Sequence, residues 1–420
     1  MEPTYSQFAT AVKPEGAFDV LAVAKRLLAA GKDVIELEIG DSPFPSASAA
    51  SAAGIAAIEA GHTHYAPSAG VAEFRAAASD YVNREFGLVT TPENIVAGPG
   101  AKTFQTLFAE AVLNPGDGVL VFSPYFPTYP PSIHRRGARM VLASLKQANA
   151  FRPNPDDVAA FLRDDPAPKA IYLNSPHNPT GGVAERDDLR AIADLVRGRD
   201  IAVFSDEPYD QMVWRGTHHS ILAEPGMLDQ CVAAYTFSKS FSMSGWRLGF
   251  SVSSETMARM LAKLTNTLLS CVPPFVQLAG TAGLRHGLSE RDTMMAEFRD
   301  KVATLVRELN RVDGIECLQP GGSFYAFPCV ADRCNELGIS SHGLAMYLLE
   351  GADETTGVAC LGGECFGEAG GGFLRMSCSE PTERIIAAIR FIDGAIRDER
   401  RIAAYLAANP HYRLPQAYTV

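Results

Sequence analysis

The sequence has little of several features that mark particular classes of protein. Its 420 residues carry 37 lysines and arginines against 48 aspartates and glutamates, a formal net charge of −11, and no basic run is interleaved with aromatics. This balance argues against nucleic acid as a partner. No stretch approaches the roughly eighteen consecutive apolar residues of a membrane-spanning helix, so no membrane partner is expected either.

Cysteine is also scarce, with 8 in the chain. The closest pairs, Cys329 with Cys334 and Cys360 with Cys365, are five residues apart. That spacing matches neither a zinc knuckle nor a thioredoxin motif, and no metal site is predicted. Free thiols, and a beginning (MEPTYSQFATAVKPEG) without the apolar stretch of a secretory signal, predict a cytoplasmic location.

Short apolar runs alternate with helical patterns between about residues 95 and 255. Helical patterns occur at 101–113 and 185–199. The runs end in polar residues, as strands do in a sheet covered on both faces: GVLVFSP (118–124), AIYLNSP (170–176), IAVFSDE (201–207), VAAYTFS (232–238) and RLGFSVS (247–253). This alternation predicts an α/β fold, with ligands outside the carboxyl ends of the strands.

The pattern changes after about residue 290. A long amphipathic helix (294–312) leads into two strand-like runs around a Pro-Gly-Gly turn (314–328), and another strand-like run follows at 371–380. We therefore predict a large domain over residues 46–290. A smaller α+β domain is expected from residues 291–420 together with the N-terminal segment 1–45.

Polar residues follow three successive predicted strands and are expected at one edge of the sheet. NSPHNPTGG (174–182) follows the first, SDEPYD (205–210) the second and TFSKS (236–240) the third. They deliver an asparagine, an aspartate with a tyrosine, and a lysine: Asn178, Asp206, Tyr209 and Lys239. Taken singly, each is equally typical of a turn, a helix cap or an ordinary surface position. Together they fit one ligand that uses them all.

A glycine-rich turn, GPGAKT (98–103), precedes these strands and opens a helix. It is not a Walker A motif, because Ala101 stands where that motif needs glycine before the lysine, and no GxGxxG is completed. Gly100 still lets the backbone approach a ligand closely, and backbone N–H groups at a helix start attract anions. A plain helix cap is the alternative. Arg247, eight residues after Lys239, adds a guanidinium suited to a phosphate.

Pyridoxal phosphate meets the requirements of this set of side chains. Its aldehyde needs an amine, its ring nitrogen an acidic partner, and its ring oxygen a hydrogen-bond donor. Its phosphate needs hydroxyls and a guanidinium. The sequence offers Lys239, Asp206, Asn178 with Tyr209, and Arg247 with nearby serine and threonine side chains.

On these motifs the chain resembles the class I/II aminotransferases of the fold-type I pyridoxal-phosphate enzymes. The match runs in register from KPEGAFDV through NSPHNPTGG, SDEPYD and SKSFSMSGWRLG to FLRMSCSEP. It implies a mainly parallel sheet in a large domain plus a smaller α+β domain. It also implies a homodimer with its sites at the interface, and a cis peptide between Asn178 and Pro179. The implied reaction moves an amino group between an L-amino acid and a 2-oxo acid by a ping-pong mechanism.

The resemblance also implies a role for each candidate site residue. Lys239 is the Schiff-base lysine and proton shuttle, and Asp206 pairs with the ring nitrogen, with Tyr129 behind it. The other implied cofactor contacts are Asn178 and Tyr209 at the ring hydroxyl, Phe126 on the ring face, and, around the phosphate, Gly100, the Ala101 and Lys102 backbone, Thr236, Ser238, Arg247 and Tyr65 of the partner subunit. Arg375 binds the substrate α-carboxylate, with Gly40 and Asn178 close by.

The amino donor stays open at this point. The arginine of the aspartate-specific branch is missing from residues 265–277. Lys102 matches a lysine that helps to bind a distal carboxylate in another branch, but its companion threonine is replaced by Ala17. Glu15 or Asp41 would instead favour a polar or cationic side chain, although surface positions explain both equally well.

Two departures from the family pattern affect the expected surroundings of the pocket. IGDSPFP (39–45) puts Ser42 and Pro43 near the substrate entrance, and GGSFYAFP (321–328) carries an extra small residue before its aromatic pair. A pyridoxal-phosphate lyase or cyclase acting on an amino acid would keep the same Lys239, Asp206 and Arg375. The motifs therefore leave that alternative reaction open.

Overall fold

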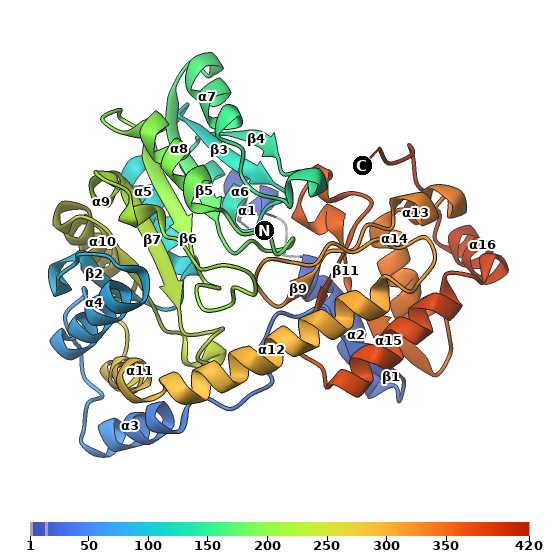
Figure 1. The fold of residues 1–420 in the computed structure, drawn as a ribbon, viewed down its shortest axis with the longest axis horizontal. Coiled ribbons are helices and arrows are strands. Elements are labelled where there is room, and N and C mark those ends of the chain that lie inside the picture. The colour runs from blue at the N-terminus through green and yellow to red at the C-terminus, as the bar shows by residue number, and fades with distance from the viewer. Residues whose placement is uncertain (1–2, 13–15, 420) are drawn as a thin grey trace.

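A seven-stranded sheet forms the centre of the larger part of the molecule (Figure 1). The computed structural model describes residues 3–12 and 16–419. All neighbouring strands are parallel except β8, which runs antiparallel to β2 and β7. Across the sheet the order is β2 (Ile95–Gly98), β8 (Gly249–Val252), β7 (Cys231–Thr236), β6 (Ala202–Asp206), β5 (Pro168–Asn174), β3 (Gly118–Ser123) and β4 (Arg139–Ser144).

Helices cover both faces of this sheet, which explains why its strands read as continuous apolar runs. All six residues of β3 are buried, and consecutive residues alternate between two cores: Val119 and Val121 enter one, Leu120 and Phe122 the other. The first core also contains side chains of α5 (Lys102–Val112), α6 (Tyr129–His134) and α10 (Glu255–Leu269). The second contains side chains of α4 (Ala72–Phe86), α7 (Pro155–Asp164), α8 (Arg186–Val196) and α11 (Pro274–His286), while α3 (Ser48–Glu59) packs on α11 and α9 (Met227–Gln230) precedes β7.

Local capping signals fix where several of these helices begin. Asn154 accepts a hydrogen bond from the Asp156 backbone at the start of α7, with Pro155 in the first turn. Ser254 caps α10 in the same way. These caps satisfy backbone N–H groups that have no partner inside the helix.

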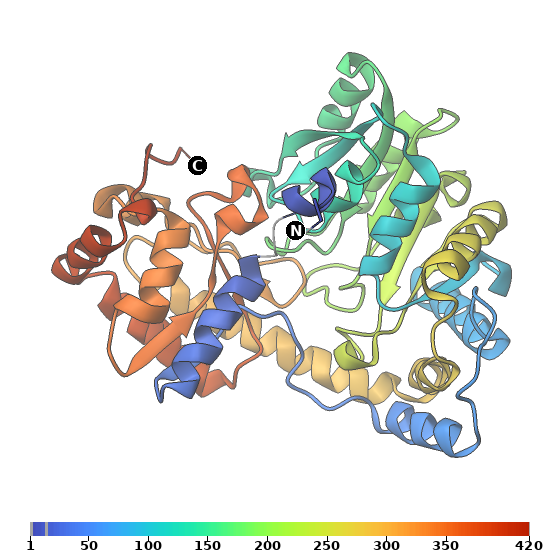
Figure 2. The same ribbon diagram turned by 180° about the vertical axis from the view of Figure 1, so that it is seen from behind.

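A separate core, away from the seven-stranded sheet, holds the C-terminal part of the chain together with the N-terminal segment. Strand β1 (Asp33–Glu36) pairs in parallel with β10 (Thr356–Ala359), and β11 (Leu361–Gly362), β12 (Leu374–Ser377) and β9 (Tyr325–Ala326) form an antiparallel sheet. The helices here are α2 (Gly16–Ala29), α13 (Ala331–Leu337), α14 (Ser341–Met346), α15 (Thr382–Ala395) and α16 (Glu399–Ala408); Figure 2 shows α2 beside the C-terminal elements. We propose that this part is the smaller domain; the boundaries at residues 45 and 290 remain a prediction.

The longest described helix, α12 (Leu288–Leu309), runs beneath both parts of the molecule (Figure 1). It buries Met294, Phe298 and Leu305 along one side and leaves charged residues on the other, as an amphipathic helix does. Within the described residues, the helices fall short of the length and apolar character that crossing a membrane requires.

The five strand-like runs of the large part correspond to β3, β5, β6, β7 and β8, so their prediction is confirmed. The first run after α12, at 314–318, was predicted to be a strand and is not one. Glu316 makes only an isolated bridge with Cys329. The Asn310 side chain bonds both the N–H and the C=O of Cys317, at 2.8 and 2.9 Å, so this backbone is satisfied without a strand partner.

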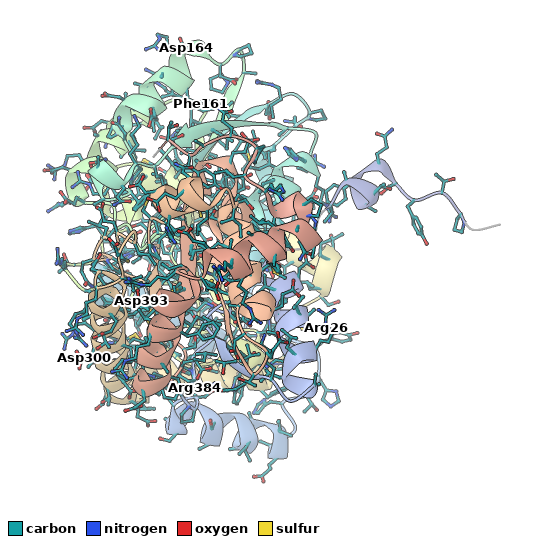
Figure 3. All side chains as sticks on the ribbon, turned by 90° about the vertical axis from the view of Figure 1, so that its right-hand side faces the viewer. Arg26, Phe161, Asp164, Asp300, Arg384 and Asp393 are labelled. Carbon is teal, nitrogen blue, oxygen red and sulfur yellow. The ribbon has the colours of Figure 1, made fainter. Side chains whose placement is uncertain are left out.

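The first helix, α1 (Gln7–Ala11), stands off the body of the molecule, as the side view of Figure 3 shows. None of its residues is buried, and Tyr5, Phe8 and Val12 all expose apolar surface.

Candidate active site

The carboxyl ends of β5, β6 and β7 open into a cleft of about 450 Å³ between the two parts of the molecule. This is the size of a small-molecule site. The predicted residues that line it are Gly40, Ala101, Lys102, Phe126, Asn178, Asp206, Tyr209, Thr236, Ser238, Lys239, Arg247 and Arg375. The structure therefore brings together residues that lie more than 300 positions apart in the chain.

Lys239 lies in the turn that follows β7, and its side chain is half-buried. Its Nζ donates to the carbonyl oxygen of Gly40 over 2.6 Å. The rings of Phe324 and Tyr209 lie 5.5 and 6.0 Å from the amine. The amine is thus held at the boundary between the two parts, by a backbone carbonyl and beside two aromatic faces.

Asp206 ends β6 and is buried. Its Oδ2 accepts from the Tyr129 hydroxyl at 2.8 Å, which confirms the predicted position of Tyr129, and from Gln105 at 3.4 Å. Its Oδ1 is buried and has no hydrogen-bond partner among the described residues. Burial raises the pKa of Asp206 to about 7, and the bond from Tyr129 opposes that rise.

Asn178 and Tyr209 approach the cleft from the loops after β5 and β6. The peptide between Asn178 and Pro179 is cis, as predicted. The Asn178 backbone is fixed by Asn174, whose Oδ1 accepts from its N–H at 2.9 Å. The Tyr209 hydroxyl donates to the Tyr325 hydroxyl at 3.2 Å. The Asn178 backbone and the Tyr209 side chain are therefore held by neighbours that also lie at the cleft.

Hydroxyls, a guanidinium and a helix start converge where the sequence predicted an anion site. Gly100 has a φ of +88°, and a Cβ there would lie 2.6 Å from Arg247 Nη2, so only glycine fits this turn without a shift. Arg247 donates to the Pro99 carbonyl at 3.0 Å and to Ser238 Oγ at 3.4 Å. Thr236 Oγ1 donates to Ser238 Oγ at 3.0 Å. This cradle suits a phosphate.

Arg375 reaches the other side of the cleft from β12. It is buried, and its guanidinium lies 4.4 Å from the centre of the Tyr325 ring. Nη1 donates to Asn178 Oδ1 at 3.2 Å and Nη2 donates to the Glu38 carbonyl, while Nε has no partner among the described residues. A buried guanidinium with a spare donor is suited to binding a carboxylate.

These observations fit pyridoxal phosphate. The cleft combines an amine, a buried carboxylate oxygen without a partner in the described residues, and an anion cradle on a glycine turn. A protonated ring nitrogen facing Asp206 Oδ1 would supply the missing partner, and its positive charge would oppose the rise in the pKa of that carboxyl.

Several polar residues around the cleft were missed from the sequence. Glu38 is fully buried, neither of its carboxyl oxygens has a partner among the described residues, and burial raises its pKa to about 7. Tyr325 lies against Gly40, where no Cβ fits. Gln105 bonds Asp206. Of these residues, only Tyr325 could have been found from the sequence, because it belongs to the run GGSFYAFP that departs from the family pattern. Glu38 and Gln105 lie in ordinary strand and helix patterns.

Glu207, which follows Asp206, anchors a second buried network that was also missed. Its carboxylate accepts from four donors at 2.7 to 2.8 Å: Ser205 Oγ, Ser220 Oγ, Tyr235 OH and His218 Nε2. Such a set holds the strand end that presents Asp206. Its signal in the sequence was the SDEPYD motif, in which only Asp206 and Tyr209 were given roles.

Three candidates lie away from the cleft or outside the described residues. Tyr65 is 90% exposed and is not among the residues that line the cleft. Asp41 is exposed, and its Oδ1 accepts from the Ser42 backbone. Glu15 lies outside the described residues.

Comparison with known proteins shows the family to which the chain belongs. A sequence model of the family "Aminotransferase class I and II" matches residues 32–392. The probable aspartate/prephenate aminotransferase of Aquifex aeolicus is 34% identical over 92% of this chain and 97% of its own. The arginine–pyruvate transaminase AruH of Pseudomonas aeruginosa is 30% identical over 92% and 97%. The structure of Thermus thermophilus aspartate aminotransferase with maleate superposes with a TM-score of 0.87, at 27% identity, over 94% of this chain and all of that one.

Proposed function

The chain belongs to the class I and II aminotransferases, so it is a pyridoxal-phosphate-dependent transaminase of fold type I, and we propose that Lys239, Asp206 and Arg375 carry its reaction. The observation that carries this proposal is their convergence in one cleft. The amine is held by Gly40, Asp206 has an oxygen without a described partner, and Arg375 has a spare buried donor.

The residues that would hold the cofactor lie on the large part of the molecule. The Ala101 and Lys102 backbone, Thr236, Ser238 and Arg247 form the phosphate cradle, and Gly100 keeps it open. Asp206 is available to the ring nitrogen, Asn178 and Tyr209 to the ring oxygen, and Phe126 to the ring face. When bound, pyridoxal phosphate supplies an electron sink for the pair released as a bond at the substrate α-carbon breaks.

Arg375 would bind the α-carboxylate of the substrate. The planar fork matches a carboxylate, and the Asn178 and Glu38 contacts fix its orientation before substrate arrives. Because the guanidinium is buried against Tyr325, the charge pair forms away from bulk water, where it is strong. This contact orients the α-carbon toward Lys239.

Lys239 would move the proton. Freed from the cofactor by an incoming amino acid, Nζ would take the proton from the substrate α-carbon and deliver it to the cofactor carbon that accepts the amino group. The Gly40 carbonyl provides a resting contact for the displaced amine, 2.6 Å away. Asp206, held by Tyr129, would face the protonated ring nitrogen at the far end of the cofactor site, and that positive charge would favour its carboxylate form.

Absorbance spectroscopy tests these assignments. Purified holoenzyme is titrated with single amino acids in the absence of an oxo acid, and the cofactor band is followed. We expect a suitable amino acid to convert the band to that of the amine form, and a 2-oxo acid to restore it. In Lys239→Ala protein, conversion by the amino acid is expected to slow by at least about 10³-fold. Conversion at the normal rate in that variant would exclude Lys239 as the catalytic residue. Turnover without accumulation of the amine form would favour the lyase or cyclase reaction.

We also propose that the preferred amino donor carries an apolar or aromatic side chain. One wall of the cleft is formed by Ala17, Phe18 and Leu21 of α2 together with Ile39. Such a wall favours an apolar side chain by burying its surface. The test compares kcat/KM for phenylalanine, leucine and aspartate. Faster transfer from aspartate would overturn this preference and would implicate Lys102 in binding the distal carboxylate.

We propose that the active form is a homodimer in which Tyr65 of the partner subunit completes each site. Support comes from exposed apolar side chains on two helices near Tyr65. Helix α3, which precedes Tyr65 in the chain, exposes Ile55 and Ile58, and helix α10, which contacts Ser68, exposes Leu268 and Leu269. The exposed helix α1 is a further surface that a second copy would cover.

Subunit mixing tests this arrangement. Lys239→Ala and Tyr65→Ala proteins are each expected to have little activity. Mixed dimers, formed after denaturation and refolding together, contain one site with both Lys239 and the partner's Tyr65. A random mixture is then expected to regain about a quarter of the unmodified activity. No recovery, with dimers present by sedimentation, would contradict the shared site.

A cytoplasmic location is proposed as well. The cysteines of the chain are all free, and each is buried or half-buried. Free thiols are typical of a reducing compartment. Cell fractionation with an antibody against the native protein tests this location.

A further inference from the structure

The segment Glu38–Ser46, here called the strap, links the two sides of the active site. It leaves β1 in the smaller part and enters α3 in the larger part. On one side its Glu38 carbonyl accepts from Arg375, and its Ile39 and Asp41 carbonyls accept from Ser379 Oγ, at 3.3 and 2.5 Å. On the other side its Gly40 carbonyl accepts from Lys239.

Two serines join the strap to the turn that carries Lys239. The hydroxyls of Ser42 and Ser242 lie 2.6 Å apart, and Ser46 Oγ donates to the Ser242 carbonyl at 2.8 Å. Ser242 in turn donates its backbone N–H to the Lys239 carbonyl at 3.1 Å, which closes the lysine turn. Ser42 was expected at the substrate entrance, but it is not among the residues that line the cleft. It faces the lysine turn instead.

The contact of Ser242 with Met294 favours Ser42 as the donor to Ser242. Ser242 Oγ lies 3.3 Å from Met294 Sδ of α12, a contact in which only the hydroxyl can donate. Ser242 therefore has its oxygen free to accept from Ser42. The Ser242 backbone has a φ of +52°, a conformation that a residue with a side chain adopts only at a cost. Hydrogen bonds from the strap help to hold it there.

We propose that the Ser42–Ser242 pair is a clasp that positions the Gly40 carbonyl to receive the displaced amine of Lys239. Ser42 and Ser242 are thus positioning residues: neither touches the reacting atoms, and both act through the strap and the lysine turn. The inference rests on the proposed role of Lys239. It accounts for the departure from the family pattern in IGDSPFP, where this chain places a hydroxyl that can bond Ser242.

The clasp matters to the reaction through the placement of the free amine. With Ser42 bonded to Ser242, the strap and the lysine turn are tied two residues beyond Gly40 and three beyond Lys239. Without it, the nearest remaining bond between the strap and the lysine turn is that of Ser46, so the Gly40 carbonyl and Nζ are held less closely. Because displacements of about 1 Å in a proton-transfer geometry slow reactions by up to roughly 100-fold, the expected loss falls on kcat. Binding of the substrate carboxylate by Arg375 is expected to change little.

The first experiment measures the half-reaction with an amino acid for Ser42→Ala, Ser242→Ala and the double variant. We expect each single variant to slow the conversion roughly tenfold at saturating amino acid with its dissociation constant changed less than about twofold, and the double variant to be no slower than either single one. Ser42→Thr, which keeps the hydroxyl, is the matched control and is expected to restore most of the rate. Additive losses, or an equal loss in Ser42→Thr, would overturn the clasp.

The second experiment needs neither cofactor nor turnover. The chain has 2 tryptophans, and Trp246 Nε1 donates to Ser46 Oγ of the strap at 3.1 Å. In a Trp214→Phe background, the emission of Trp246 therefore reports on the strap. We expect Ser42→Ala to shift this emission to longer wavelength and Ser42→Thr to leave it unchanged. If Ser42→Ala leaves the emission unaltered, the clasp is refuted. If the unmodified protein transfers no amino group, the proposed function fails, and the fluorescence still decides the clasp.

Discussion

Tyr129→Phe tests how the protein sets the charge of Asp206. The Tyr129 hydroxyl donates to Asp206 Oδ2 over 2.8 Å, and both groups are buried. Burial raises the pKa of this carboxyl to about 7, and the bond from Tyr129 is the largest effect in the opposite direction. A hydrogen bond to a charged group contributes about 1.5–3 kcal/mol. The protonated carboxyl would lose only a neutral bond worth about 1 kcal/mol, so the charged form loses about 1–2 kcal/mol more. The pKa of Asp206 is therefore expected to rise by about 1, since about 1.4 kcal/mol corresponds to one pKa unit.

The effect on stability has a definite sign in the cofactor-free protein. Folding raises the pKa of Asp206 from 3.8 to about 7, so the native state becomes less stable as the pH rises through that range. Near pH 5 the carboxyl is protonated with or without Tyr129, and the variant loses only a neutral hydrogen bond, worth about 1 kcal/mol. Near pH 8 the unmodified protein holds a carboxylate there, and the variant loses about 2–3 kcal/mol.

Urea unfolding of the cofactor-free proteins at pH 5 and pH 8 measures this difference. Tyr172→Phe is the matched control, because its ring lies 5.2 Å from that of Tyr129 and it is equally buried, but its hydroxyl donates to the Gln105 carbonyl and not to Asp206. The control is expected to lose the same amount at both pH values. An equal loss at pH 5 and pH 8 in Tyr129→Phe would refute the assignment of a charge-assisted bond to Asp206.

Three further substitutions probe the rest of the site. Arg375→Lys keeps the charge but loses the fork, so we expect KM for amino acids to rise roughly 100-fold; unchanged KM in steady-state assays would place the α-carboxylate elsewhere. Gly100→Ala puts a Cβ 2.6 Å from Arg247 Nη2 at a φ of +88°, so cofactor retention during dialysis is expected to fall, with a stability loss of about 1–2 kcal/mol; full retention would contradict the cradle. Glu207→Gln removes the charge that His218 and three hydroxyls bond, and urea unfolding is expected to show a loss of about 2–4 kcal/mol; a neutral result would contradict the network.

The sequence best predicted the positions of the candidate site residues that directly follow strands. Asn178, Asp206 and Lys239 each follow an apolar run, and parallel neighbours bring such ends together, so their meeting in one cleft follows from local pattern and sheet topology. The position of Tyr129 behind Asp206 followed from the family pattern and is confirmed. The roles of these residues in catalysis stay predictions until the variants above are measured.

What escaped prediction depends on contacts between distant parts of the chain. The pair Ser42 and Ser242 is 200 residues apart, and no local periodicity specifies it. Glu38 is buried just after β1, whose partner strand β10 lies more than 300 residues later. The missing strand at 314–318 has a local cause instead, since the side chain of Asn310 bonds the Cys317 backbone that a partner strand would otherwise bond.

Helix α12 contacts elements on both sides of the active site. Near one end, Met294 contacts Ser242 at the lysine turn, and farther along the helix packs against α15 and β9. From Met294 to Leu309 the helix is about 22 Å long, so it spans much of the distance between the two parts. Strand β9 pairs with β12, the strand of Arg375. The helix therefore joins the turn that carries Lys239, through Met294, to the sheet that carries Arg375, through β9.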